Sequence, residues 1–213
     1  MIWQRLLHWL YPPHCPGCRR RVPASGTWCP TCWGEIWHPR MIPGSRKAHL
    51  AGCYAVGDYR AGLREAIVSL KFRKQKHQIP FLVTLLESFP WQDRLGGDWL
   101  YVPIPISEER RRERGFDQTE EVFGEYCRRH GCRWRPLLRK VRHTQAQSGL
   151  PRHLRKDNIK GAFAMEDASL QGQRIVLVDD IFTTGYTMYE AARILHRAGA
   201  GEIVGWVLAS GRG

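Results

Sequence analysis

The sequence predicts an α/β protein: an open, mostly parallel twisted sheet flanked by helices, preceded by a small N-terminal module with four cysteines. Three observations predict this architecture. Residues 175–178 form a continuous apolar run, which is typical of a parallel strand covered on both faces. A helical pattern over 188–198 and a second apolar strand over 202–209 follow, and such a strand–helix–strand unit requires a right-handed crossover. Upstream, two Cys-x-x-Cys pairs lie within residues 15–32.

The composition is that of a globular protein with a large positive charge. The 213 residues include 33 Lys and Arg against 20 Asp and Glu, a net charge of +13. An apolar content of 43% and a charged content of 25% exclude wholesale disorder and the collagen-like and coiled-coil classes. No apolar run approaches the about 20 residues that a membrane-spanning helix needs. The first ten residues lack a small-residue cleavage site, so we expect a cytoplasmic protein with a polyanionic partner.

The cysteine spacing predicts a structural zinc site. Ten residues separate the two Cys-x-x-Cys pairs, and the total of seven cysteines does not suit a disulfide framework. Four thiolates can surround Zn2+ as a closed tetrahedron that stabilises a small module and does no chemistry. A redox dithiol or inert core thiols are the alternatives, and His14 or His38 is an alternative ligand. The predicted ligands are Cys15, Cys18, Cys29 and Cys32.

The remaining elements follow from apolar periodicity and from turn residues. We expect a short amphipathic helix over 1–12 and a turn-rich basic linker over 39–48, which divides a module of residues 1–48 from a domain of residues 49–213. Cys127 falls on the apolar side of a predicted helix, where cysteine is usually a small hydrophobe. In chain order the domain should contain a strand at 54–59, helices at 63–70 and 80–89, a strand at 99–104, a polar loop or solvated helix start at 107–115, and a helix at 120–130 closed by Gly131.

The loop after the apolar run at 175–178 has the chemistry of a sugar-phosphate site. Asp179 and Asp180 end the run, and three threonines and a glycine over 183–187 precede a helix N-terminus, where unpaired N–H groups favour a phosphate. The carboxylates would repel that phosphate, so they should accept hydrogen bonds from hydroxyls of the same ligand. The alternative is that Thr187 and Glu190 form only a capping box and that the acids cap a turn.

Residues 176–187 resemble the phosphoribosyl-pyrophosphate (PRPP) signature of type I phosphoribosyltransferases. From about Pro12 to Ser210 the chain resembles the ComF family, which includes the late-competence protein ComFC and GntX-like proteins. One departure is Asp117, where the family usually has Asn. The matching stretches are the cysteine pairs and residues 63–72, 102–105, 110–118, 144–150, 155–158 and 161–163.

The resemblance implies a phosphoribosyltransferase-like fold and a role for each matching residue. The PRPP loop would comprise Asp179, Asp180, Ile181, Phe182, Thr183, Thr184, Gly185, Tyr186 and Thr187, with the two acids on the ribose hydroxyls. Pyrophosphate would face Pro103, Ile104 and Pro105 and the arginines of a mobile loop, Arg110, Arg111, Arg112 and Arg114. Mg2+ would bridge pyrophosphate and ribose oxygens. Asp179, Asp180 and Arg114 are candidate catalytic residues, but no base is identified, so enzymatic activity stays open.

Basic clusters interleaved with aromatic residues such as Phe72, Phe116 and Trp134 predict binding of single-stranded DNA, although solvated faces are the alternative. The DNA-binding candidates are Lys71, Arg73, Lys74, Lys76, Arg139 and Arg142. The resemblance also implies a role in DNA uptake during natural transformation, beside a ComFA-type helicase-like ATPase. It leaves open peripheral attachment to the inner face of the cell membrane.

Three functions are therefore considered. The first is a competence factor that binds PRPP and single-stranded DNA. The second is a phosphoribosyltransferase acting on an unidentified base, amine or nucleotide. The third is a non-catalytic module whose zinc knuckles dock a partner and whose PRPP pocket is a sensor.

Overall fold

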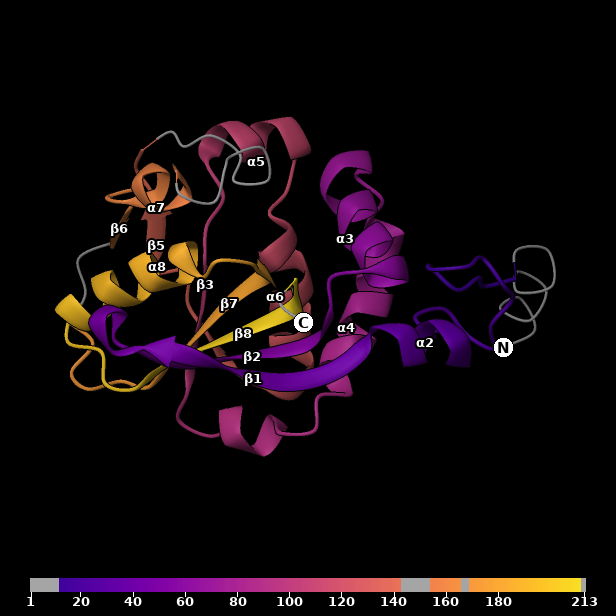
Figure 1. Cartoon of the computed structure of the whole chain (residues 1–213), viewed down its shortest axis with the longest axis horizontal. Coiled ribbons are helices and arrows are strands. Elements are labelled where there is room, and N and C mark those ends of the chain that lie inside the picture. Colours follow the sequence, from indigo (N-terminus) through magenta and orange to yellow (C-terminus); the bar gives the residue numbers. More distant parts are fainter. Residues whose placement is uncertain (1–11, 143–153, 166–168, 212–213) are drawn as a thin grey trace.

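The computed structural model describes residues 12–142, 154–165 and 169–211, and its centre is a six-stranded sheet of order β1-β2-β8-β7-β3-β4 (Figure 1). The sheet consists of β1 (Trp37–Ser45), β2 (Leu50–Asp58), β3 (Leu100–Pro103), β4 (Arg133–Trp134), β7 (Ile175–Phe182) and β8 (Ile203–Ser210). All neighbouring pairs are parallel except β1 and β2, which are antiparallel. The predicted α/β class with a mostly parallel sheet is confirmed. The helix predicted over 1–12 and the stretch 144–150 fall on residues outside the described ranges.

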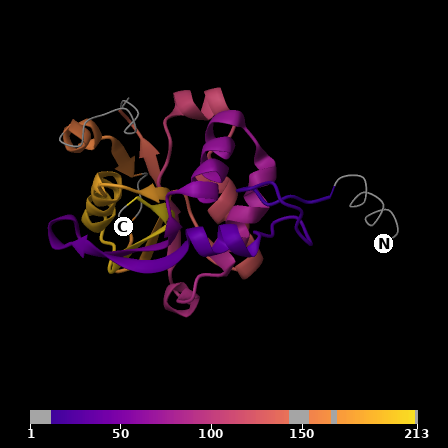
Figure 2. The ribbon, with the colours of Figure 1, turned by 45° about the vertical axis from the view of Figure 1, so that its right-hand side comes forward.

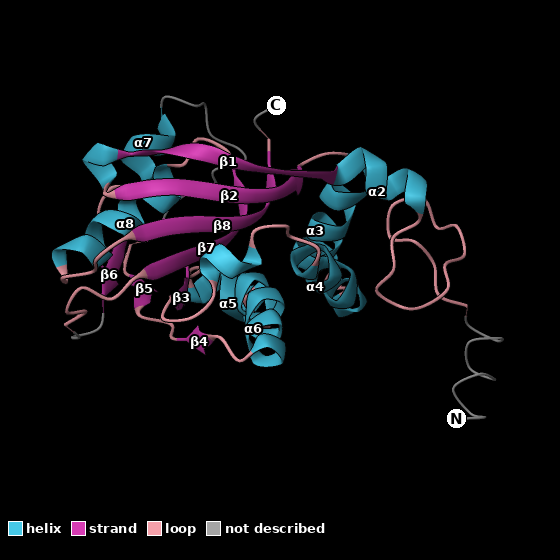
Figure 3. Cartoon of the chain, turned by 90° about the horizontal axis from the view of Figure 1, so that it is seen from below, coloured by secondary structure: helices cyan, strands magenta, loops and turns pink. Residues whose placement is uncertain are grey.

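Helices cover both faces of this sheet (Figure 3). On one side, α4 and α6 pack on β8, β7 and β3, and on the other α8 packs on β2, β7 and β8. Strand residues alternate between the two cores: Val176 and Val178 face one, whereas Ile175 and Leu177 face the other. The helices are α2 (Pro30–Ile36), α3 (Ala61–Arg73), α4 (Ile79–Glu87), α5 (Glu108–Arg114), α6 (Gln118–His130), α7 (Leu154–Ile159) and α8 (Tyr186–Arg197), and β5 (Leu138–Lys140) pairs with β6 (Phe163–Met165).

The segment predicted as a linker over residues 39–48 is instead a strand and a short 3-10 turn. β1 pairs with β2 in a register that sets Ile42 opposite Cys53, and Ile42 is buried. Pro39 and Pro43 suggested a linker because proline cannot donate a ladder hydrogen bond. β1 is an edge strand, so one of its two sides needs no partner, and proline is tolerated there. The sheet therefore begins before the boundary predicted at residue 48.

The cysteine-bearing segment lies against α3 and α4 (Figure 2). The Trp28 indole donates a hydrogen bond from Nε1 to the carbonyl of Phe81 at 3.0 Å, and the two rings meet edge to face. Gly17 and Gly62 allow a direct approach of the two backbones, because a Cβ on Gly62 would lie 2.7 Å from Gly17 Cα. The module therefore packs against the same helix, α3, that leads to the site described below.

Helix ends agree in part with the predictions. Gly131 closes α6 in the left-handed conformation, as predicted. The polar segment 107–115 is helix α5, capped by Ser107. The capping box predicted for Thr187 and Glu190 is not formed, because α8 begins at Tyr186 and places Thr187 within its first turn. Among the residues that the structure describes, no helix combines the length and apolar character needed to cross a bilayer.

Candidate functional site

The four predicted zinc ligands form one cluster. Their sulfur atoms all lie within 4.8 Å of one another, and Cys18 Sγ is 3.6 Å from Cys29 Sγ. A tetrahedral Zn2+ with bonds of about 2.3 Å requires sulfur atoms about 3.8 Å apart, so the cluster fits the ion. Backbone N–H groups of Cys29 and Cys32 donate to cluster sulfurs at 3.5 Å, which orients the thiolates. His14 and His38 are not members of the cluster.

The Asp pair lies at the carboxyl end of β7, the edge at which open α/β sheets bind ligands. Asp180 is buried, with 6% of its surface exposed, and its Oδ2 accepts hydrogen bonds from two side chains. Lys71 Nζ on α3 lies at 2.5 Å and Gln118 Nε2 on α6 at 2.9 Å. The Asp179 carboxylate accepts the Asp180 N–H at 2.8 Å. Two helices thus hold the pair in place.

Lys71 has a different position from the one predicted. Sequence reasoning grouped it with an exposed DNA-binding run, whereas its side chain is mostly buried and ion-paired with Asp180. Neighbouring residues on a helix point in different directions, so a basic run is divided between the pocket and the solvent. Neither Lys71 nor Gln118 was predicted as part of this site. They precede Asp180 by 109 and 62 positions, and nothing local in the sequence indicates a contact over such separations.

Burial and neighbouring charges shift the protonation of Asp179. Burial raises the pKa of Asp179 well above its ordinary value, the neighbouring Asp180 raises it further, and Lys71 opposes both effects. Removing two adjacent carboxylates from water is costly, so the pair needs cations or hydroxyl donors. The hydroxyls of a diol are donors of this kind.

The threonine loop after β7 forms the second half of the site. It encloses a small hollow lined by both β7 and the start of α8. Gly185 adopts a φ of 80°, and a Cβ there would lie 2.6 Å from the Phe182 ring, so glycine is required. The Thr184 hydroxyl is buried and has no hydrogen-bond partner among the described residues. Thr183 and Thr187 line the hollow, and the buried Thr184 hydroxyl of the same loop needs a polar partner, for which a phosphate oxygen is suited.

The turn predicted to face pyrophosphate lies beside this edge. The Ile104 N–H donates to the carbonyl of Val178 at 3.0 Å, which holds the turn after β3 against β7. The Ile106 N–H donates to Asp117 Oδ2 at 3.2 Å, and Asp117 Oδ1 accepts the Thr119 N–H at 2.9 Å. Asp117 thus caps α6 through one oxygen, a role that Asn fills equally well, and holds the turn through the other, which the amide nitrogen of Asn could not do. The departure from the family pattern is therefore compatible with the site.

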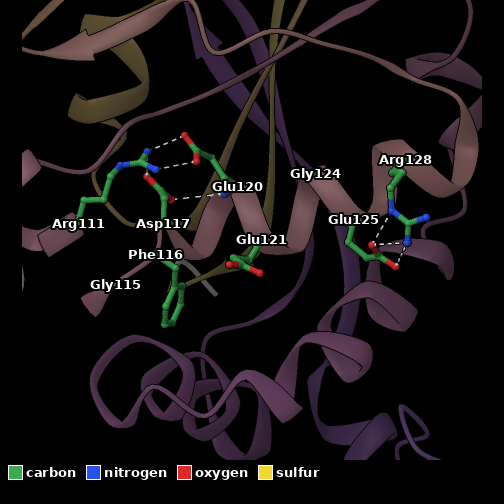
Figure 4. A pocket seen from close by; sticks show the side chains of 9 residues that line it. All are labelled: Arg111, Gly115, Phe116, Asp117, Glu120, Glu121, Gly124, Glu125 and Arg128. Atoms are coloured by element: carbon green, nitrogen blue, oxygen red, sulfur yellow. Dashed lines mark hydrogen bonds and ion pairs between the residues drawn. The ribbon is translucent and has the colours of Figure 1, made fainter. Parts of the chain in front are cut away.

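The four predicted pyrophosphate arginines have three different surroundings. Arg114 donates to Gln118 Oε1 at 2.7 Å, and its pKa is lowered by burial and by Arg110, with Asp180 opposing, so Arg114 lies near the pair and Arg110 lies near Arg114. Arg112 is exposed. Arg111 instead forms a bidentate pair with Glu120 at 2.7 and 2.9 Å, as Figure 4 shows. We therefore keep Arg110 and Arg114 as pyrophosphate candidates and assign Arg111 to the structure of α6.

The groove in Figure 4 is distinct from the site. Its volume is about 430 Å³, and acidic side chains dominate its lining. Each of these acids already has a partner: Glu120 and Asp117 bind Arg111, Glu121 binds Lys76, and Glu125 binds Arg128. The groove therefore offers no free group for a ligand.

Lys140 belongs to the site although the sequence analysis did not name it. It lies on β5, half-buried, and its pKa is lowered to about 8 by burial and by Arg110, while Asp179 raises it. Lys140 therefore lies near enough to both Arg110 and Asp179 to be influenced by their charges. It was missed because residues 133–160 have weak periodicity, so no strand was predicted there.

The exposed DNA-binding candidates form two groups. Near the end of α3, Lys74 is exposed, Arg73 pairs with Glu65 at 2.6 Å, and Lys76 pairs with Glu121 at 2.6 Å. Surface pairs of this kind contribute little energy, so these cations can exchange partners for phosphates.

The second group is on and after β5. Arg139 is exposed. Arg142 donates to three carbonyls of residues 157, 158 and 160, which end α7, at 2.7–3.1 Å. Arg142 is exposed as well, but these three bonds give it a structural role, which leaves Arg139 as the DNA-binding candidate of this group.

Comparison with known proteins agrees with this architecture. Residues 6–42 match the family model of the double zinc ribbon domain, and residues 122–212 match that of the phosphoribosyl transferase domain. The chain is 31% identical to the DNA utilization protein YhgH of Salmonella typhi, covering 95% of this chain and 91% of the relative. It is 26% identical to Competence protein F of Haemophilus influenzae (92% and 89%) and 29% identical to Competence protein ComFC of Bacillus subtilis (87% and 72%). The chain therefore belongs to the ComF/YhgH family, in which a zinc ribbon precedes a phosphoribosyltransferase domain.

Proposed function

We propose that this protein binds PRPP at the carboxyl edge of β7. The observation that carries the proposal is the pairing of two adjacent acids, the half-buried Asp179 and the buried Asp180, with the unpartnered buried hydroxyl of Thr184 on the adjoining loop. The ribose diol would bind the acids, the 5'-phosphate the threonine loop, and the pyrophosphate the cations Arg110, Arg114 and Lys140. Mg2+ would bridge pyrophosphate and ribose oxygens, with the Asp pair as its nearest carboxylates.

Calorimetry with Mg2+ and PRPP tests this pocket. We expect binding by the wild type and by the control Asp93→Asn, which changes an exposed acid on another face. The double variant Asp179→Asn, Asp180→Asn should lose binding, because amides keep the shape but accept hydrogen bonds from a diol more weakly. Equal affinity of the double variant and the wild type would show that the pocket lies elsewhere.

We also propose that the protein binds single-stranded DNA and supports DNA uptake in natural transformation. The names of its relatives, which refer to competence and to DNA utilization, support this, as do the net charge of +13 and the exposed cations at the end of α3. A ComFA-type helicase-like ATPase is the proposed partner. A cytoplasmic site of action follows, with peripheral attachment at the inner face of the cell membrane as one form of it.

Fluorescence anisotropy with a labelled single-stranded oligonucleotide tests the DNA proposal. Affinity should fall steeply between about 50 and 200 mM salt, because phosphate contacts release counterions. The variant Arg73→Gln, Lys74→Gln should lower the salt slope by up to about two, one for each cation, whereas Arg94→Gln, on the exposed turn after α4, should not. Absence of binding or a flat salt response would reject the proposal.

Two alternatives involve the same pocket. In an active transferase, departure of pyrophosphate from C1 would be assisted by charge neutralisation from Arg114 and its neighbours, and the ribosyl group would pass to a base or nucleotide. Release of pyrophosphate with any member of a panel of acceptors would establish this activity. In a sensor, PRPP would bind without turnover and the zinc module, over residues 1–48, would dock a partner for the domain of residues 49–213.

A further inference from the structure

Phe72 is the most exposed large apolar side chain that the structure describes, with 66% of its surface accessible. It lies in the last turn of α3, directly after Lys71, which is paired with Asp180. Its exposure means that the ring contributes little to the core, so core packing does not explain an aromatic residue at this position.

A continuous set of contacts links the Phe72 ring to the ribose-binding acids. Arg114 Cζ lies 5.2 Å from the ring centroid, a cation–π contact. Arg114 in turn donates to Gln118, and Gln118 donates to Asp180, at 2.7 and 2.9 Å. Because Lys71 also binds Asp180, two successive residues of α3 contact the same network. The ring is thereby linked through Arg114 and Gln118 to the edge at which we propose that PRPP binds.

The surroundings of the ring are basic. Arg73 and Lys74 follow it on the chain and are exposed, and Lys76 lies beyond them. An exposed ring flanked by cations is the arrangement in which bases stack while their phosphates are neutralised. A peptide or lipid partner would bury a wider apolar surface than one phenyl ring.

We propose that Phe72 is a stacking platform for a nucleobase at the mouth of the PRPP pocket, with Arg114 supporting the ring from the pocket side. The ligand is a purine or pyrimidine carrying at least one phosphate, either as a free nucleotide or as a unit of single-stranded DNA. This inference rests on the proposed function and adds to it the class of molecule that binds beside the ribose of PRPP.

The test separates stacking from phosphate contacts by changing both the ring and the base. Phe72→Leu keeps an apolar side chain but removes the π face, and Phe72→Tyr keeps it. The ligands are a single-stranded oligonucleotide and its abasic counterpart of equal length, with nucleoside monophosphates as competitors. Met41→Ala, which alters another exposed apolar side chain on edge strand β1, is the matched control.

With the normal oligonucleotide we expect Phe72→Leu to bind at least about fivefold more weakly than the wild type, while Phe72→Tyr and Met41→Ala bind as the wild type does. With the abasic oligonucleotide all variants should bind equally. Competition by a monophosphate assigns the platform to free nucleotides, and its absence assigns it to DNA. Equal binding of wild type and Phe72→Leu to both oligonucleotides, or no binding of any base-containing ligand by the wild type, overturns the platform.

The outcome for PRPP is independent of this test. Phe72→Leu should still bind PRPP, with no greater loss than follows from the missing ring contact to Arg114, because the Asp pair and the threonine loop are unchanged. If the Phe72 proposal fails while PRPP still binds, the proposed PRPP pocket stands. The proposed function is tested separately, by whether the double variant Asp179→Asn, Asp180→Asn loses PRPP binding.

Discussion

The contact between Gly17 and Gly62 predicts that one added methyl group will separate the zinc module from α3. A Cβ on Gly62 would lie 2.7 Å from Gly17 Cα and 2.9 Å from Trp28 Cζ3. The first neighbour is backbone and cannot rotate away. The second is the indole ring that hydrogen-bonds to Phe81, so it is fixed as well. The module must therefore shift to accommodate Gly62→Ala.

Two effects of opposite sign decide the magnitude. Overpacking of a well-packed contact costs about 1–3 kcal/mol. Replacing glycine by alanine in a helix contributes at most about 1 kcal/mol of stability, and less in the first turn, where Gly62 lies. The contact effect is larger, so we expect a net loss of about 1–2 kcal/mol. In a chain of this size that lowers the Tm by about 2–8 °C.

Thermal unfolding of Gly62→Ala and of a matched control measures this effect. The control is Gly124→Ala in α6, where a Cβ would meet only Trp134 at 3.9 Å, so this variant should melt at or above the wild-type temperature. Hydrogen exchange should also quicken in residues 15–32 of Gly62→Ala. If Gly62→Ala melts as high as Gly124→Ala, the proposed close packing of module and domain is wrong.

Three further predictions follow from the cysteines and the Asp pair. Four thiolates around Zn2+ should order residues 15–32. Removing the metal with a chelator, or substituting Cys18→Ser, should therefore lower the zinc content below one ion per chain and quicken hydrogen exchange in this segment. The raised pKa of Asp179 means that the native state binds more protons than the unfolded state, so the wild type loses stability as the pH rises above about 4. Asp179→Asn should therefore have a higher Tm than the wild type, and the difference in Tm should grow with pH. An advantage that shrinks with rising pH would contradict this. A hydrogen bond from the buried Cys127 thiol lowers the pKa of Cys132 to about 7. The rate at which iodoacetamide alkylates Cys132 should therefore rise with pH with a midpoint near 7. A midpoint at or above 8.5, the ordinary pKa of cysteine, would contradict the contact.

The sequence was most informative where the signal is local. The strand at 175–182 and the helix after it follow from an unbroken apolar run and a glycine-containing loop, and both are present. The cysteine cluster follows from two short spacings, each of which places two sulfur atoms on one tight turn. The positive φ of Gly131 could be predicted because glycine tolerates it at a helix end.

The sequence failed where tertiary contacts decide a residue's role. Lys71 and Arg73 belong to one basic run, yet one enters the pocket and the other faces solvent, depending on how α3 crosses the end of β7. Lys140 lies in a two-stranded ladder whose strands have three residues each, too short for a periodic signal. The strand β1 was missed because its prolines suggested a linker, and only its place at the sheet edge makes them acceptable.

The central claim is that PRPP occupies the carboxyl edge of β7, and a crystal structure with Mg2+ and PRPP tests it most directly. We predict electron density for the ribose diol on the carboxylates of Asp179 and Asp180, and for the 5'-phosphate within hydrogen-bond distance of the Thr184 hydroxyl, which would satisfy its buried oxygen. Density for PRPP at another surface, or an unaltered Asp pair and threonine loop at saturating PRPP, would contradict the account.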